Sequence, residues 1–270
     1  MTIPPATSPA QIYNDFFSPQ MFTPWAKNLV EQSTPSAGDR VVDLACGTGL
    51  LTEQIAPHLG NNGSIVGLDF APPMLAVAQT REFNGPSVEW IDASADAIPL
   101  PDNSFDRVYC QQGFQFFPDR AKAVPEVRSV LKPGGLTAIS LWAPVEEFPL
   151  RDQMFNSIAK FLNVPLEVAA KPFTFGGSEP MQSMLDDAGF SDIVITTRSN
   201  ESVFGPPESF VKLTVMGAAA AIPTFGELTD EEKQSVIAHV EVENYDEIAK
   251  YVQDGHVSMA LTSFTATATA

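Results

Sequence analysis

The residues best suited to chemistry lie in two short stretches of the first third of the chain. The segment VVDLACGTG, ending at Gly49, places Gly47 and Gly49 one residue apart after an apolar run that contains Asp43. Glycine has no Cβ, so such a turn allows tight backbone geometry and close approach of a ligand. A second acid, Asp69, ends the next apolar run, where a carboxylate can accept hydrogen bonds from both ribose hydroxyls. The turn and Asp69 together predict a ligand that contains a nucleoside.

Two other ligand classes fit these residues less well. A dinucleotide fingerprint would have a third glycine at position 52, where this chain has Thr52. The chain also lacks Gly-Lys-Ser/Thr, which excludes a Walker-type phosphate loop. Asp43 adds negative charge beside the turn, and this charge suits an ammonium group better than a pyrophosphate.

Composition excludes several function classes. The chain has 270 residues, with 33 acidic and 15 basic side chains and a formal charge of −18, which disfavours nucleic acid and anionic membranes as partners. It shows no secretory signal and no apolar run near the roughly 20 residues that span a bilayer. The two cysteines, Cys46 and Cys110, are too few for a disulfide framework or a zinc cluster. We therefore expect a soluble, cytoplasmic protein with no bound metal and no membrane span.

The elements that must position these residues alternate between strands and helices. Helix-length patterns at about 50–59, 72–82 and 119–131 separate five short β-rich runs, which read RVVDLA, SIVGLDF, VEWIDA, FDRVYCQ and LTAISLW. Nearly continuous apolar strands that alternate with helices predict a parallel sheet covered on both faces. Ligands of such sheets bind beyond the carboxyl ends of the strands.

The second half of the chain follows a different pattern. Helices are predicted near 150–163 and 179–188, followed by the strand DIVITTRS. The next stretch is mostly helical, with a capping box from Thr229 to Glu232, and the strand HVSMALTSFTA comes last. The predicted segments are an N-terminal helical segment that closes the cofactor site, a core, a helical lid, and a final strand with the tail, at 1–35, 36–205, 206–254 and 255–270.

Four stretches in this order carry a family resemblance: VVDLACGTG, GLDFAPPML, AIPLPDNSFDRVYCQQGFQFF and RSVLKPGG. Together they resemble the class I S-adenosylmethionine (SAM)-dependent methyltransferases of the UbiE-like small-molecule group, whose domain is known as methyltransferase type 11. The resemblance is strong over about 36–144 and weaker at IYNDFFSPQMFTPWAKNLVE. We therefore expect a Rossmann-like, doubly wound, mostly parallel seven-stranded sheet with helices on both faces and an α-helical lid.

The resemblance implies roles for individual residues. The methionine part of SAM would be held by Asp43, Ala45, Gly47 and Gly49, and the ribose by Asp69. The adenine would lie between Phe70 and Met74. Gln111 and Gln112 would lie beside the methionine carboxylate and the methyl group. Tyr13 and Trp25 would close the pocket. The helical spacing of Trp25 from Phe22 and Leu29 also fits a position in the helix core.

One position departs from the family. Ser94 stands where the family usually has an aspartate that contacts the adenine amino group. The Ser94 hydroxyl, the Asp92 carboxylate or the backbone at Ala95 could take its place. Among the residues that follow the fourth strand, Phe114, Phe116 and Phe117 fit either an acceptor wall or ordinary packing.

The resemblance implies an enzyme that converts SAM to S-adenosylhomocysteine by methylating an O, N or C atom of a small molecule. The aromatic strand end FQFF and the apolar stretch LTVMGAAAAIP in the predicted lid favour an apolar or aromatic acceptor, such as a product of secondary metabolism or a quinone-type lipid intermediate. No catalytic residue stands out; His239 and His256 in the predicted lid are the candidates for a base. Three alternatives remain open: a SAM-binding enzyme that catalyses cyclisation or elimination without methyl transfer, an NAD(P)-dependent oxidoreductase, and a binding protein without turnover. The acceptor and the choice between monomer and homodimer are open as well.

Overall fold

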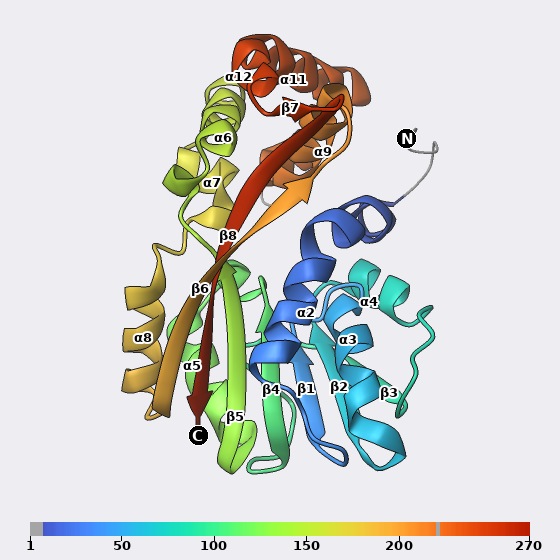
Figure 1. The fold of residues 1–270 in the computed structure, drawn as a ribbon, viewed down its shortest axis with the longest axis vertical. Coiled ribbons are helices and arrows are strands. Elements are labelled where there is room, and N and C mark those ends of the chain that lie inside the picture. Colours follow the sequence, from blue (N-terminus) through green and yellow to red (C-terminus); the bar gives the residue numbers. More distant parts are fainter. Residues whose placement is uncertain (1–7, 220–221) are drawn as a thin grey trace. The chain divides into compact units, whose positions relative to one another are not determined.

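The computed structural model describes residues 8–219 and 222–270, which form two compact units (Figure 1). The core unit comprises residues 8–141, 177–197 and 263–270. The helical unit comprises residues 142–176 and 198–262, apart from 220–221. The predicted division placed 142–176 in the core and began the lid at 206. The two units instead group 142–176 with the later helices, so the proposed lid segment is only a part of the helical unit.

The sheet has the predicted doubly wound topology. Among the described residues, seven strands lie in the order β3-β2-β1-β4-β5-β8-β6, and the two-residue β7 pairs with β8 off this path. β1 pairs in parallel with β2 and β4, β2 with β3, and β4 with β5. The strand order reverses between β1 and β4, the point where such sheets bind ligands. The bounds are Arg40–Leu44 (β1), Ser64–Asp69 (β2), Val88–Asp92 (β3), Phe105–Gln111 (β4), Leu131–Trp142 (β5), Ser191–Val203 (β6), Val252–Gln253 (β7) and His256–Thr269 (β8).

The helices of the core unit begin with an N-terminal run that contains a ten-residue π-helix. This run consists of α1 (Pro9–Ile12), the π-helix η1 (Tyr13–Phe22) and α2 (Thr23–Gln32). The predicted crossover helices are confirmed, although the second ends at Ala78 rather than at 82. The remaining elements of this unit are α3 (Leu50–Leu59), η2 (Gly60–Asn62), α4 (Pro72–Ala78), η3 (Phe114–Phe116), α5 (Arg120–Val130) and α8 (Ser178–Asp187).

The helical unit contains the predicted capping box. The Thr229 hydroxyl accepts the N–H of Glu232, and the Glu232 carboxylate accepts the N–H of Thr229 at 2.7 Å, which confirms the predicted start of α11. The elements of this unit are η4 (Val145–Glu147), α6 (Pro149–Leu162), α7 (Leu166–Ala169), η5 (Lys171–Phe173), α9 (Pro207–Ala219), α10 (Pro223–Gly226), α11 (Asp230–Glu243) and α12 (Tyr245–Ala249).

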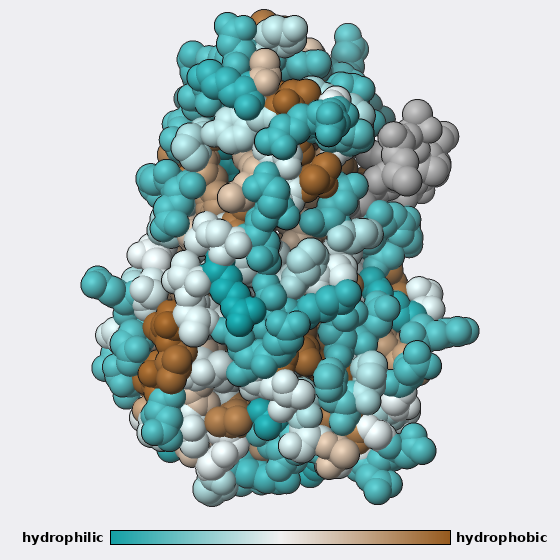
Figure 2. Space-filling model, in the orientation of Figure 1, coloured by the Kyte–Doolittle hydropathy of each residue, from teal (hydrophilic) through white to brown (hydrophobic). Residues whose placement is uncertain are grey.

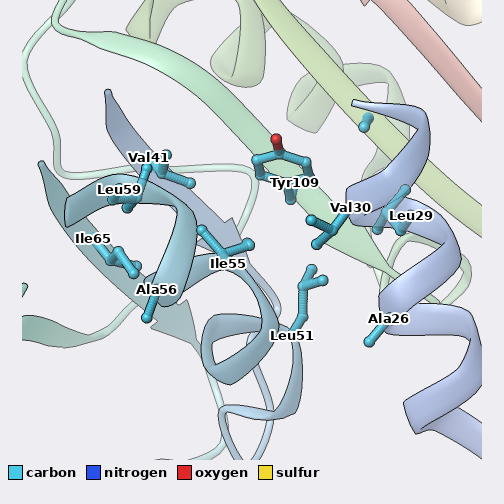
Figure 3. Packing of buried hydrophobic residues seen from close by; sticks show 11 residues of the cluster. Ala26, Leu29, Val30, Val41, Leu51, Ile55, Ala56, Leu59, Ile65 and Tyr109 are labelled. Atoms are coloured by element: carbon cyan, nitrogen blue, oxygen red, sulfur yellow. The ribbon is translucent and has the colours of Figure 1, made fainter. Parts of the chain in front are cut away.

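One face of the sheet is closed by two helices that pack on each other and on the strands. Figure 3 shows side chains of α2, α3, β1, β2 and β4 meeting in a single cluster around Tyr109. The Tyr109 ring is fully buried, and its hydroxyl donates to the Ser33 carbonyl just beyond α2. The other labelled members are Ala26, Leu29, Val30, Val41, Leu51, Ile55, Ala56, Leu59 and Ile65. This packing holds the first residues of α3 against the end of β1, where the glycine turn lies.

The face of the molecule drawn in Figure 2 is largely hydrophilic. Figure 2 shows a face covered mainly by polar side chains, with small apolar areas between them. Within the described residues, no helix combines the length and the apolar character that a membrane span requires. The same residues contain no group of three acidic, His or Cys side chains placed to bind a metal ion.

A close contact between neighbouring strands requires glycine at position 67. Gly67 on β2 pairs with Trp90 on β3, and a Cβ built on Gly67 would lie 2.3 Å from the indole ring. That separation is far below a van der Waals contact, so a methyl group would have to displace the indole.

We expect Gly67→Ala to lower the free energy of unfolding by about 1–3 kcal/mol, because it overpacks the contact with Trp90. Urea denaturation measures the loss. In a Trp90→Leu background the same glycine change should cost clearly less, since the ring is gone. Equal costs in the two backgrounds would contradict the steric explanation.

Candidate functional site

The turn between β1 and α3 contains three residues with left-handed backbone conformations. Their φ angles are 57° at Ala45, 55° at Gly47 and 79° at Gly49. A Cβ on Gly49 would lie 3.0 Å from the Trp90 ring, so Gly49 is needed for packing as well as for conformation. A Cβ on Gly47 would meet nothing within 4 Å. The backbone at Gly47 therefore borders open space that a ligand can enter.

The carboxylate of Asp69 supports this turn from the end of β2. Its Oδ2 accepts the N–H of Gly47 at 2.8 Å, and its Oδ1 accepts the N–H of Ala71 at 2.9 Å. The residue is only 7% exposed, and burial raises the pKa of Asp69 although both N–H groups act in the opposite direction. Each carboxylate oxygen has a further lone pair. Asp69 can therefore hold the turn and still accept two hydroxyl groups from a ligand.

A second carboxylate, Asp43, is buried beneath the turn. The Thr52 hydroxyl donates to its Oδ2 at 2.5 Å, and burial raises the pKa of Asp43 to about 7. Thr52 occupies the position where a dinucleotide fingerprint has its third glycine. The departure from that fingerprint therefore has a structural purpose, since a glycine could not donate this hydrogen bond. Sequence reasoning noted Thr52 but did not predict this contact.

A small pocket lies above the turn, and all of its lining residues belong to the core unit. The predicted site residues that line it are Tyr13, Asp43, Ala45, Gly47 and Gln111. The lining residues that sequence reasoning missed are Phe22, Cys46, Thr48, Leu50 and Leu51. Thr48 lies within the glycine turn and Leu50 and Leu51 directly follow it, so their place at the start of the first crossover helix was a usable signal. Phe22 gave none, because its position depends on the π-helix.

Eight of the predicted residues do not line this pocket, and two of these, Trp25 and Gln112, are buried in the core. Trp25 on α2 is 3% exposed and belongs to the core, whereas Phe22 reaches the pocket and accepts a hydrogen bond at its carbonyl from Gln111 Nε2 at 2.9 Å. Gln112 has a φ of 43°, which turns its side chain away from the pocket that Gln111 lines. The Gln112 amide donates to Ser263 at 3.0 Å and accepts from Ser140 at 3.2 Å.

The residues predicted to hold an adenine lie on the same edge of the sheet, outside the pocket lining. Phe70, directly after β2, is 63% exposed, a large value for an aromatic ring, and Met74 is half-buried on α4. Ala95 is buried and Ser94 half-buried. A hydrogen bond from Ser94 lowers the pKa of Asp96, so a charged carboxylate lies beside the position that lacks the usual aspartate. Sequence reasoning did not consider Asp96.

The candidate acceptor wall and the candidate bases are mostly engaged in packing or surface contacts. Phe114 and Phe117 are buried and pack at 5.1 Å, so only Phe116, 40% exposed, presents much surface. In the helical unit, His239 packs 4.9 Å from the Phe161 ring, with its Nε2 3.1 Å from a Glu243 oxygen. His256 is exposed at the start of β8. A catalytic role for either histidine stays a prediction.

Arg81 connects the N-terminal segment with the glycine turn. Its Nε donates to the Thr48 carbonyl at 2.5 Å, and its terminal nitrogens contact the Glu53 carboxylate on α3 and the Asn14 amide oxygen on η1. Because η1 begins with Tyr13 and ends with Phe22, both of which line the pocket, Arg81 ties that wall of the pocket to the turn.

Comparison with known proteins gives consistent results. Residues 41–135 match a family model described as a methyltransferase domain. A demethylmenaquinone methyltransferase from Staphylococcus epidermidis (strain ATCC 35984) is 28% identical over 195 residues, which cover 67% of this chain and 80% of that protein. One from Staphylococcus aureus (strain JH9) is 29% identical over 193 residues, covering 67% and 79%.

Solved structures share the fold. The YcgJ protein from Bacillus subtilis superposes with a TM-score of 0.57 at 21% identity, covering 91% of this chain and 97% of that one. A putative methyltransferase from Bacillus halodurans C-125 gives a TM-score of 0.57 at 20% identity, covering 90% and 97%. These neighbours confirm the Rossmann-like α/β architecture.

We expect Arg81→Met to loosen η1, because it removes the contacts to Thr48, Glu53 and Asn14 together. Limited chymotrypsin digestion should then cleave at Tyr13, Phe17 or Phe22 several-fold faster than in the wild type. Arg128→Met is the matched control, since it removes an arginine–carbonyl hydrogen bond to Gly189 elsewhere in the core unit. Unchanged cleavage in Arg81→Met would contradict the tie between η1 and the turn.

We expect Asp43→Asn to flatten the dependence of stability on pH. The pKa of Asp43 is about 7 in the folded protein, above its unfolded value of about 3.9, so the folded state holds the extra proton between those pH values. The free energy of unfolding therefore falls as pH rises through this window, and Asp43 accounts for at most about 4 kcal/mol of that fall. Urea denaturation at pH 5 and pH 8 measures it. Asp102→Asn, in an exposed turn, is the control and should keep the wild-type dependence of stability on pH. If Asp43→Asn kept that dependence as well, Asp43 would not be its source.

Proposed function

We propose that this chain is a class I SAM-dependent methyltransferase and that it methylates an O, N or C atom of a small, apolar or aromatic acceptor. The observation that carries the proposal is the pair of buried carboxylates, Asp43 and Asp69, on either side of the open backbone at Gly47. This arrangement suits a ligand with ribose hydroxyls and an ammonium group, and SAM has both.

The residues present fit the cofactor. In the proposed site, Asp69 accepts the two ribose hydroxyls through its remaining lone pairs while it holds Gly47. Asp43 would hold the methionine ammonium, because a cation there would favour the charged carboxylate over the protonated form that burial favours. Gln111 and the backbone from Ala45 to Gly49 complete the amino-acid end. Phe70 offers its exposed ring to the adenine.

Bound SAM supplies a methyl group activated on a sulfonium. That group would be transferred by in-line displacement to an acceptor lone pair, with the carbon–sulfur electrons passing to sulfur. The chain's own residues orient the reactants and exclude water, and an acceptor hydroxyl or carbon acid also loses a proton to a base. His239 and His256 remain the candidates for that base. The helical segment 206–254 remains the proposed lid for acceptor selection.

Two observations support an apolar or aromatic acceptor. The relatives at 28–29% identity are named for demethylmenaquinone, and the resemblance covers two thirds of this chain. In the helical unit, the buried side chains near Phe173 are mostly aromatic, and they include Phe148 and Phe155. Secondary metabolism is a suitable setting for such a reaction, and the atom that is methylated stays open.

We expect calorimetric titration to show micromolar binding of SAM and S-adenosylhomocysteine and no binding of NAD. Asp69→Ala should weaken both adenosyl ligands about 100-fold, since two hydrogen bonds to a charged group are lost at roughly 1.5 kcal/mol each. Asp102→Ala, an exposed carboxylate in the same unit, should bind as the wild type does. Binding of NAD in place of SAM would overturn the proposal.

Product analysis separates methyl transfer from the non-methylating alternative. With an accepted aromatic substrate, a methyltransferase forms S-adenosylhomocysteine in equal amount to the methylated product. Conversion of substrate without S-adenosylhomocysteine would instead indicate cyclisation or elimination.

A further inference from the structure

The helical unit contains a buried arginine that has no anionic partner among the described residues. Arg151 on α6 is 5% exposed, and its Nε makes no hydrogen bond within that part of the chain. Burial lowers the pKa of Arg151 to about 10, and no nearby carboxylate acts against this shift. The guanidinium nevertheless stays charged at neutral pH. A buried cation normally has an acid beside it, because leaving water without one is costly.

Aromatic rings surround this guanidinium instead. Its central carbon lies 5.6 Å from the centre of the Phe173 ring, 5.1 Å from that of Phe204 and 5.8 Å from that of Phe210. All three rings are buried, and Phe173 also packs against Trp142 and Phe148. Ring faces attract the cation, but they do not satisfy the fork of N–H donors that arginine presents.

The guanidinium of Arg151 determines which kind of ligand could pair with it. A guanidinium is planar and binds carboxylates and phosphates through two parallel hydrogen bonds, which a lysine cannot reproduce. Rings on several sides favour an apolar or aromatic body on the same ligand. A purely structural Arg151 is the simpler alternative. It leaves the lack of a partner unexplained, because a methionine would fill similar volume without the cost of burying a charge.

We propose that Arg151, with Phe173, Phe204 and Phe210, binds an anionic oxygen group carried by an apolar or aromatic molecule, a carboxylate in the first instance. The ligand of this site is then an aromatic or apolar acid rather than a neutral molecule.

The test titrates the full-length protein with benzoate, with its neutral analogue benzamide and with inorganic phosphate. We expect benzoate to bind at least 10-fold more tightly than benzamide. Arg151→Met should lose that preference, whereas Lys160→Met, which removes an exposed positive charge from the same helix, should keep it. Arg151→Lys retains the charge without the planar fork, and it should bind benzoate several-fold more weakly than the wild type. This milder variant keeps the test decisive if Arg151→Met does not fold.

The outcomes divide as follows. Preference for benzoate that depends on Arg151 supports the site, and binding of phosphate that depends on Arg151 supports it with a phosphate as the physiological group. Equal affinity for benzoate and benzamide, no binding of any probe, or unchanged binding in both Arg151 variants overturns it.

Titration of the same samples with SAM separates the two proposals. If benzoate binds through Arg151 and SAM does not bind, the anion site stands and the proposed function fails; if SAM binds and no probe does, the anion site alone fails.

Discussion

The hydrogen bonds that Asp69 accepts from Gly47 and Ala71 determine the geometry of the whole cofactor end of the sheet. They join the end of β2 to the turn after β1, and they hold Gly47 with its backbone facing open space. A buried carboxylate is costly unless it is hydrogen-bonded, and two backbone N–H groups offset that cost without using all of its lone pairs. One side chain therefore shapes the turn and remains able to bind a ligand. This double use explains why the glycine spacing and the acid twenty residues later occur together in the sequence.

Asp43 completes this arrangement by making the site electrostatically selective. Its burial favours the neutral form, and the nearby charge of Asp69 acts in the same direction. Two buried acids destabilise each other when both are charged, so the protein without ligand is less stable at high pH than its packing alone would allow. A cationic ligand reverses the balance, because it favours both carboxylates in their charged forms. The same two carboxylates that lower the stability of the ligand-free protein would therefore favour a positively charged ligand over an anionic dinucleotide.

The sequence was sufficient wherever position depends on local chemistry. The strands, the crossover helices, the capping box at Thr229 and the carboxylates at Asp43 and Asp69 all follow from short patterns. It was insufficient where one dihedral angle or one helix type decides the outcome. Gln111 and Gln112 are adjacent and chemically identical, and only the positive φ of Gln112 sends one amide into the core. Helical spacing correctly indicated that Trp25 belongs to the core. The π-helix before α2 changes the angular spacing of its side chains from the usual 3.6 residues per turn, so ordinary periodicity does not predict that Phe22 lines the pocket.

The two units carry different kinds of recognition. The core unit presents buried carboxylates and backbone N–H groups, which suit a polar, positively charged cofactor. The helical unit contains the one buried guanidinium of its described part, Arg151, beside the rings of Phe173, Phe204 and Phe210. The chain passes between the units within β5, β6 and β8 and between Gly176 and Gly177, so neither unit is a simple appendage at one end of the sequence. The anion site proposed around Arg151 therefore lies within the helical unit, and the turn with Asp43 and Asp69 lies within the core unit, so substitutions at one site leave the packing of the other unchanged.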